Sequence, residues 1–105
     1  MTDSILARRS DFLLQLFAAA PMKQTFEMLL SFDHAGDAHF TMPYDSKFTH
    51  SLDDTHGGVI ATLLDNAGWF TAATRYDTWV NTSDLMIRLL EPAQREALHA
   101  KGKVI

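Results

Sequence analysis

The stretch that decides the fold is THGGVIATLLDNAGWFTAAT, residues 55–74. Its apolar side chains recur at steps of three and four residues, which predicts a helix of about five turns from Gly57 to about Tyr76. A helix that only fills a core needs neither a Gly-Gly start nor a carboxylate at its middle. Gly57, Gly58 and Asp65 are therefore candidates for a functional site. The recurring apolar side chains are Val59, Ile60, Leu63, Leu64, Ala67 and Phe70.

The segment before this helix predicts a helix followed by a hairpin. Residues 3–19 carry an apolar stripe, with Asp3 or Ser4 available as a cap and Pro21 as the stop. Apolar residues then alternate over 26–32, the turn residues DHAGD follow at 33–37, and AHFTMPY at 38–44 has the pattern of a returning strand. The histidines in this hairpin, His34 and His39, are expected in solvated positions.

The remaining segments complete a single α+β domain, residues 1–105. Residues 45–56 are polar without a period and predict a loop. TSDLMIRLLEPA, residues 82–93, predicts a strand that ends at Pro92, and ALHAKGKVI, residues 97–105, predicts another with His99 facing outward. The order of helix, two strands, long helix and two strands indicates an antiparallel sheet.

Composition excludes several classes of function. The net charge of −4 provides no broad basic surface for nucleic acid, and the absence of cysteine excludes disulfides and thiolate chemistry. No apolar run approaches the roughly 20 residues that a membrane-spanning helix needs. The charged residues near the N-terminus favour a cytoplasmic protein, although the small residues before Pro21 leave export as an alternative.

The start of the long helix has the chemistry of an anion-binding or oxyanion-stabilising element. Unpaired N–H groups and the positive end of the helix dipole lie there, and glycines let a carbonyl or phosphate come close. Asp65 has no cation within one helical turn, because the residues three and four positions away are uncharged. The pattern is equally compatible with an Asp65 that points into solvent beside Asn66.

The spacing of Gly57 and Asp65 limits how a catalytic site that uses both could be built. Gly57 and Asp65 lie eight residues apart, which is about 12 Å along a helix axis. One helix cannot easily place both groups near 3 Å from the same reacting atoms. Two such helices antiparallel across a two-fold axis can do so, and a catalytic site would then lie at a dimer interface.

HGGVIATLLDNAG, together with TSDLMIRLLEPA and ALHAKGKVI, resembles the hotdog-fold acyl-CoA thioesterases of the phenylacetate-pathway type. The resemblance covers residues 25–105 and leaves residues 1–20 as an extra N-terminal helix. It implies a long central helix wrapped by a curved antiparallel sheet, and active sites shared in a homodimer or homotetramer. It also implies hydrolysis of an acyl-CoA thioester, with coenzyme A as part of the substrate and with no cofactor or metal.

The resemblance also assigns roles to individual residues. Asp65 matches the general base or nucleophile, and Gly57 matches the glycine whose N–H polarises the thioester carbonyl. His56 matches a histidine that shapes the site. Thr82 matches a residue that helps hold the attacking water, with neighbouring Ser83 as the weaker candidate. Gly58 and Asn66, beside these residues, are expected to contact substrate.

Two departures from the family pattern bear on activity. His50 stands where related enzymes carry an Asn or Gln; a neutral histidine can still donate one hydrogen bond, and otherwise this contact is lost. The family domain also continues for about two strands beyond the position of Ile105. An incomplete hotdog core with an unpaired sheet edge is therefore expected.

Two further groups of residues were assigned by position alone. Side chains expected to line an acyl pocket are Leu52, Leu64, Trp69, Phe70 and Met86, and cations expected to meet the CoA phosphates are Arg88, Lys101 and Lys103.

Two other functions compete with hydrolysis. One is a non-catalytic hotdog module that binds acyl-CoA or serves as an assembly subunit. The other is a zinc or manganese site in the loop HSLDDTH, formed by His50, Asp53, Asp54 and His56.

Overall fold

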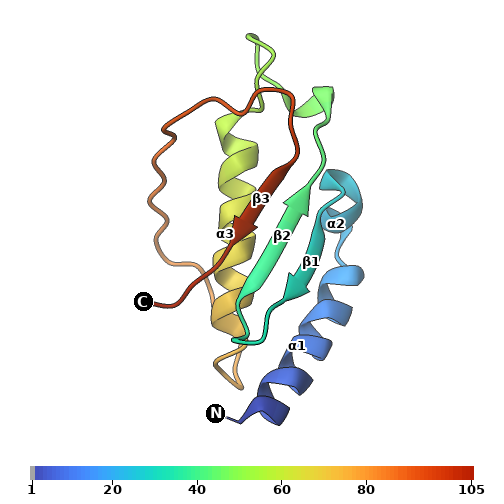
Figure 1. Ribbon diagram of the computed structural model, residues 1–105, viewed down its shortest axis with the longest axis vertical. Coiled ribbons are helices and arrows are strands. Elements are labelled where there is room, and N and C mark those ends of the chain that lie inside the picture. Colours follow the sequence, from blue (N-terminus) through green and yellow to red (C-terminus); the bar gives the residue numbers. More distant parts are fainter. Residues whose placement is uncertain (1) are drawn as a thin grey trace.

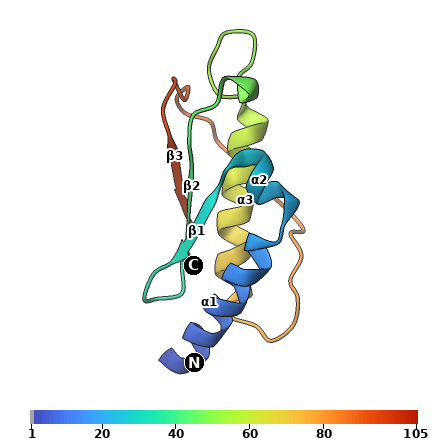
Figure 2. The same ribbon diagram turned by 90° about the vertical axis from the view of Figure 1, so that its right-hand side faces the viewer.

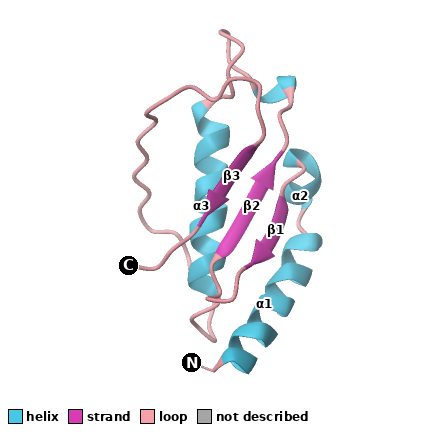
Figure 3. Ribbon diagram, in the orientation of Figure 1, coloured by secondary structure: helices cyan, strands magenta, loops and turns pink. Residues whose placement is uncertain are grey.

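The structure is a computed structural model, and it describes residues 2–105. Three α-helices, three strands and one short 3₁₀ helix make up the fold (Figures 1 and 3). In chain order these are α1 Asp3–Ala18, α2 Pro21–Phe26, β1 Leu29–Phe32, β2 Ala38–Met42, the 3₁₀ helix Ser46–Phe48, α3 Gly57–Ala73 and β3 Leu98–Lys101. None of the helices formed by the described residues has the length and apolar character required to cross a membrane.

The three strands form one antiparallel sheet in the order β1-β2-β3. In its register Phe40 of β2 lies opposite Leu30 of β1 and Ala100 of β3, and these side chains share the inner face. Figure 2 shows α1 and α3 on the same side of the sheet, α3 against β2 and β3, and α1 against β1. Side chains such as His39 and His99 lie on the opposite, outer face of the sheet.

An aromatic cluster joins the two layers. Phe40 is fully buried and lies edge-on to Phe17 of α1, with ring centroids 5.1 Å apart, and 5.5 Å from Phe70 of α3. Aromatic pairs in such tilted geometries contribute about 0.5–1.5 kcal/mol beyond the area that they bury. The cluster fixes α1 and α3 to the central strand and so fixes the orientation of the long helix.

The first helix has the predicted extent but a different cap. The Thr2 hydroxyl oxygen accepts the Ile5 N–H at 3.3 Å, so the cap is neither Asp3 nor Ser4. Pro21 ends α1 as expected, and it also begins α2, where its missing N–H costs no hydrogen bond. Phe26, predicted as the start of the first strand, is consequently the last residue of α2, and β1 begins at Leu29.

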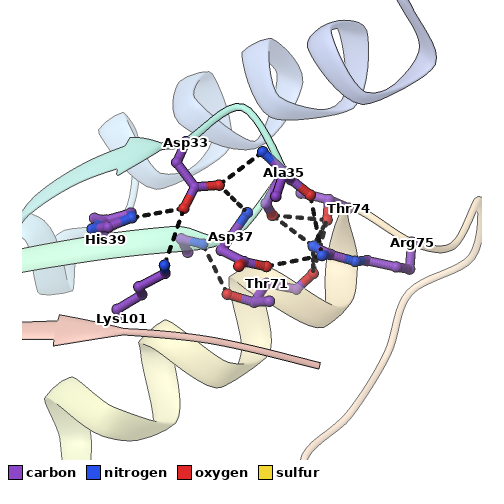
Figure 4. A network of polar contacts seen from close by, with 10 residues as sticks. Asp33, Ala35, Asp37, His39, Thr71, Thr74, Arg75 and Lys101 are labelled. Carbon is purple, nitrogen blue, oxygen red and sulfur yellow. Dashed lines mark hydrogen bonds and ion pairs between the residues drawn. The ribbon is translucent and has the colours of Figure 1, made fainter. Parts of the chain in front are cut away.

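Polar contacts hold the β1–β2 turn against the end of α3. The Arg75 guanidinium donates to the Gly36 carbonyl at 2.7 Å and to the Asp37 carboxylate at 2.8 Å, and Asp37 is buried. Thr71 accepts the Ala38 N–H at 2.8 Å (Figure 4). Because one arginine contacts several groups of the turn, the turn and the C-terminal end of α3 are connected.

The strand predicted for residues 82–93 is absent. Residues 79–90, called the extended segment below, pair with no strand among the described residues and run back beside α3 from its C-terminal to its N-terminal end (Figure 1). Local alternation fits an extended chain, but a strand also needs a neighbour for its backbone groups. Among residues 2–105, β3 pairs with β2 only, and no strand pairs with its other edge.

Candidate functional site

The N-terminus of α3 is capped by a histidine. His56 has extended backbone angles, and its Nδ1 accepts the Gly58 N–H at 2.8 Å. The Gly57 N–H makes no hydrogen bond within residues 2–105. His56 therefore satisfies one of the free donors at the helix start, and the Gly57 N–H is left without a hydrogen-bond partner among the described residues.

A shallow cavity of about 270 Å³ adjoins this helix start. Gly57 and His50 line it together with residues 89–93, at the end of the extended segment and just after it. The His50 ring accepts the Leu52 N–H at 3.0 Å through Nδ1, which leaves Nε2 as its free ring nitrogen. A Cβ at Gly57 would lie 2.6 Å from the Leu89 Cδ1, so this leucine side chain rests against the helix start.

Asp65 lies two turns further along α3 and is partly buried. The Thr82 hydroxyl donates to its Oδ1 at 2.7 Å. Thr82 belongs to the extended segment, and the Trp69 indole N–H donates to the Val80 carbonyl at 2.7 Å just before it. These two contacts attach the segment to α3 and place a hydroxyl donor on the carboxylate.

The other two residues assigned to the site point elsewhere. The Asn66 amide donates to the Thr62 carbonyl at 2.9 Å and contacts the Met22 sulfur at 3.3 Å, so it faces α2. Ser83 is exposed, and its hydroxyl contacts the Asp84 carboxylate at 3.3 Å. Neither side chain contacts Asp65.

The predicted residues thus form two groups on one helix. His50, His56, Gly57 and Gly58 lie at the N-terminal end of α3, and Asp65 with Thr82 lies near its middle. The axial separation of about 12 Å keeps the groups apart within one chain. A site that uses both groups needs a second chain.

The residues assigned by position are not brought together. Leu52 and Met86 are 80% and 85% exposed, whereas Trp69 and Phe70 line a cavity of about 360 Å³ beside α1 and α2. Lys101 points to the outer face of the sheet, where its Nζ lies 3.6 Å from the Asp33 carboxylate. The positional assignment failed because it did not use the direction of each side chain.

Sequence reasoning missed a cavity of about 530 Å³ between α1 and the loop after α3. Its walls include Phe12 and Trp79, whose ring centroids are 6.0 Å apart, together with Arg9. Arg9 donates to the Thr74 carbonyl at 3.0 Å and pairs with Asp77. The aromatic residues flanking Asp77 were the signal in the sequence that could have indicated it.

An interacting group of polar side chains lies on the outer face of the sheet. Asp33 accepts the Ala35 and Asp37 N–H groups, both at 3.0 Å, and its other oxygen lies 2.9 Å from the His39 Nε2 (Figure 4). The hydrogen bond with His39, and then those with the two backbone groups, lower the pKa of the Asp33 carboxyl to about 2. His39 thus lies at a partly exposed strand position, as expected, and its ring also has a partner in Asp33.

The loop HSLDDTH does not form a metal centre. Within residues 2–105, no group of three or more His, Asp or Glu side chains is arranged to hold a metal ion. His50 and His56 instead accept backbone N–H groups, and Asp53 lies 4.0 Å from the Arg95 guanidinium. These local contacts occupy the side chains that the alternative required.

Comparison with known proteins gives matches at the level of structure. No protein-family model matches the chain, and no curated protein sequence matches it. One similar crystal structure is a phenylacetic acid degradation-related protein and candidate thioesterase from Ralstonia eutropha JMP134. The match has a TM-score of 0.72 at 20% identity and covers 87% of this chain and 73% of that one.

A second similar structure is an X-ray structure of a protein from the thioesterase superfamily, with a TM-score of 0.69 at 20% identity. It covers 91% of this chain and 69% of that one. Both matches cover most of this chain, and they confirm the predicted fold class. The chain therefore has the hotdog fold of thioesterase-superfamily proteins.

Proposed function

We propose that this protein is a thioesterase that hydrolyses an acyl-CoA to the free acid and coenzyme A. The observation that carries the proposal is the hydrogen bond from Thr82 to Asp65 on the central helix. An acid on a largely apolar helix, oriented by a hydroxyl, is suited to hold and deprotonate a water molecule. The fold shared with thioesterase-superfamily structures supports the same reaction class.

The proposed reaction uses two chains of a homo-oligomer. Asp65 of one chain takes a proton from water, and the resulting hydroxide attacks the thioester carbon. The Gly57 N–H at the start of the facing α3 donates to the oxygen that becomes negatively charged. Collapse of the tetrahedral intermediate breaks the carbon–sulfur bond and releases the CoA thiolate. In an alternative route, the Asp65 carboxylate attacks the carbon itself, the carbon–sulfur bond breaks with release of the CoA thiolate, and water then hydrolyses the resulting mixed anhydride to the free acid and Asp65.

A second candidate function is a non-catalytic module that binds acyl-CoA. The observation that favours it is the Leu89 side chain lying against Gly57, because this contact restricts access to the proposed oxyanion donor. Such a module would bind acyl-CoA without using the Gly57 N–H and without turning it over.

The test is release of free thiol from phenylacetyl-, benzoyl- and medium-chain acyl-CoA. We expect turnover by the wild type and a loss of at least about 100-fold in Asp65→Asn, the low end of the contribution of a general base. Asparagine keeps an oxygen that can accept from Thr82, so the local structure is preserved. Asp53→Asn removes an exposed carboxylate at a residue with φ of 70°, which asparagine tolerates, and serves as the control.

Light scattering on each variant must show the same assembly before rates are compared. Equal turnover in wild type and Asp65→Asn would reject the catalytic role of Asp65. Binding of acyl-CoA without turnover in a well-formed wild-type oligomer would favour the binding module.

A further inference from the structure

We propose that His39 and His99 form a binding site for a divalent transition-metal ion on the outer face of the sheet. The two residues come from neighbouring strands, β2 and β3, and are 60 positions apart in the sequence. Their ring nitrogens, Nδ1 of His39 and Nε2 of His99, lie 3.2 Å apart. The site is separate from the N-terminus of α3 and does not depend on the proposed hydrolysis.

The separation of the two nitrogens fits a shared ion. With imidazole nitrogens about 2.0–2.1 Å from a zinc-like ion, a 3.2 Å separation corresponds to an N–metal–N angle of about 100°. That angle lies between the tetrahedral and octahedral values. The ring centroids are 5.3 Å apart and the His99 side chain is exposed, so its ring can turn to direct both lone pairs at one ion.

Asp33 supplies the outer partner that metal-binding histidines usually have. Its Oδ2 lies 2.9 Å from the His39 Nε2, so the imidazole proton is held on Nε2 and Nδ1 carries a lone pair directed towards His99. The two backbone N–H groups that Asp33 accepts fix the carboxylate in turn.

The neighbouring groups limit how tightly an ion can bind and which ions the site can bind. The Lys101 ammonium is 3.6 Å from the Asp33 carboxylate and opposes a cation electrostatically. Because residues 2–105 hold no cluster of three or more ligands, two imidazoles and water would complete the coordination. Imidazole ligands without thiolates favour Zn²⁺, Ni²⁺ or Cu²⁺ over Mg²⁺ or Ca²⁺.

The experiment titrates ZnCl₂, NiCl₂ and CuCl₂ into the full chain at pH 7.5 in a non-chelating buffer, followed by calorimetry. We expect saturable binding with one ion per chain at this site, reversed by EDTA. His99→Gln should abolish that binding. His34→Gln, which removes an exposed histidine from the nearby turn, should leave it unchanged. Equal affinity in His99→Gln and wild type, or no binding of any of the three ions, would overturn the proposal.

Two further variants separate metal binding from a simple hydrogen bond between the rings. Asp33→Asn should weaken the affinity by about tenfold, because Asp33 acts through His39. Lys101→Met should tighten binding by removing the opposing charge. Electron paramagnetic resonance of the Cu²⁺ form should show two coordinating nitrogens in the wild type and fewer in His99→Gln. A spectrum unchanged by His99→Gln would mean that the rings share a hydrogen bond only.

Discussion

Asp33 occupies the first position of the turn between β1 and β2 and is linked to both edges of that turn. Its interactions with His39 and with the backbone lower its pKa from the ordinary 3.8 to about 2. Above pH 4 the carboxylate is ionised in both the folded and the unfolded chain, and its full stabilisation is present. As the pH falls from about 4 towards 2, the unfolded chain takes up a proton that the folded chain does not, and this stabilisation is lost.

Replacement of Asp33 by asparagine should therefore flatten the acid limb of the stability curve. Asparagine keeps an acceptor for the Ala35 and Asp37 N–H groups, so the turn is retained. The free energy of unfolding should fall less steeply between pH 4 and 2 in Asp33→Asn than in the wild type, as measured by urea denaturation. Asp11→Asn, on the exposed face of α1, is the control and should keep the wild-type slope. Identical slopes for Asp33→Asn and the wild type would contradict the prediction.

Single residues were predictable where the cause is local. The histidine and glycines before α3 identified its start, because helix caps depend on neighbouring residues. The group on the outer face was not predicted, since it depends on a register that places His99 diagonally across from His39. Nor did the pattern show that Thr82 contacts Asp65, because that contact needs the extended segment to return beside α3.

At the scale of elements, the chain comes very close to α3 at Gly102, the residue that directly follows β3. A Cβ at Gly102 would lie 2.0 Å from the Thr71 Oγ1 and 2.3 Å from the Ala67 carbonyl oxygen. The Gly102 N–H also donates to the Ala38 carbonyl at 2.9 Å, so this backbone is fixed to β2. The small residues on one face of α3 allow this approach, and no side chain fits between the layers.

Two glycine substitutions should thus have opposite effects. Gly102→Ala should lower the free energy of unfolding by about 1–3 kcal/mol, because the helix backbone must move to admit the methyl group. Gly68→Ala should raise it by about 0.5–1 kcal/mol, since Gly68 is an exposed helical residue with nothing within 4 Å of the added Cβ. Chemical denaturation measures both. A Gly102→Ala variant as stable as the wild type would show that β3 and α3 can separate freely.

The sequence predicted some of the elements correctly and others not, and each outcome has a physical reason. Both long helices followed from apolar periodicity, which reports burial on one face. The short helix α2 was missed, because Pro21 can end one helix and begin the next. The strand over residues 82–93 was wrong because alternation describes side chains, whereas pairing depends on a second backbone that the local sequence does not contain.

At the scale of the whole molecule, the extended segment resembles the edge strand of a sheet before its neighbouring strand has paired with it. Met86 and Leu90 are 85% and 86% exposed, while Leu85 and Leu89, which directly precede them, are about half exposed. Alternate side chains thus face away from α3, and the backbone of the segment has no strand partner among residues 2–105. Exposed apolar side chains on unpaired extended backbone are typical of a surface that associates with another chain. This surface supports the proposed homo-oligomer.

Replacing the outward-facing Met86 and Leu90 with lysine should break that association. We expect the wild type to be a dimer or tetramer by size-exclusion chromatography with light scattering, and the double variant Met86→Lys and Leu90→Lys to move towards the 11.8 kDa chain mass. Because both side chains are exposed in the single chain, the substitutions should cost the isolated fold little. Leu29→Lys is the matched control, since it charges a 62% exposed leucine on the outer face of β1. A monomeric wild type, or a double variant with unchanged mass, would contradict the role of this segment. Loss of assembly together with loss of thioester turnover would place the catalytic groups of two chains at the same interface.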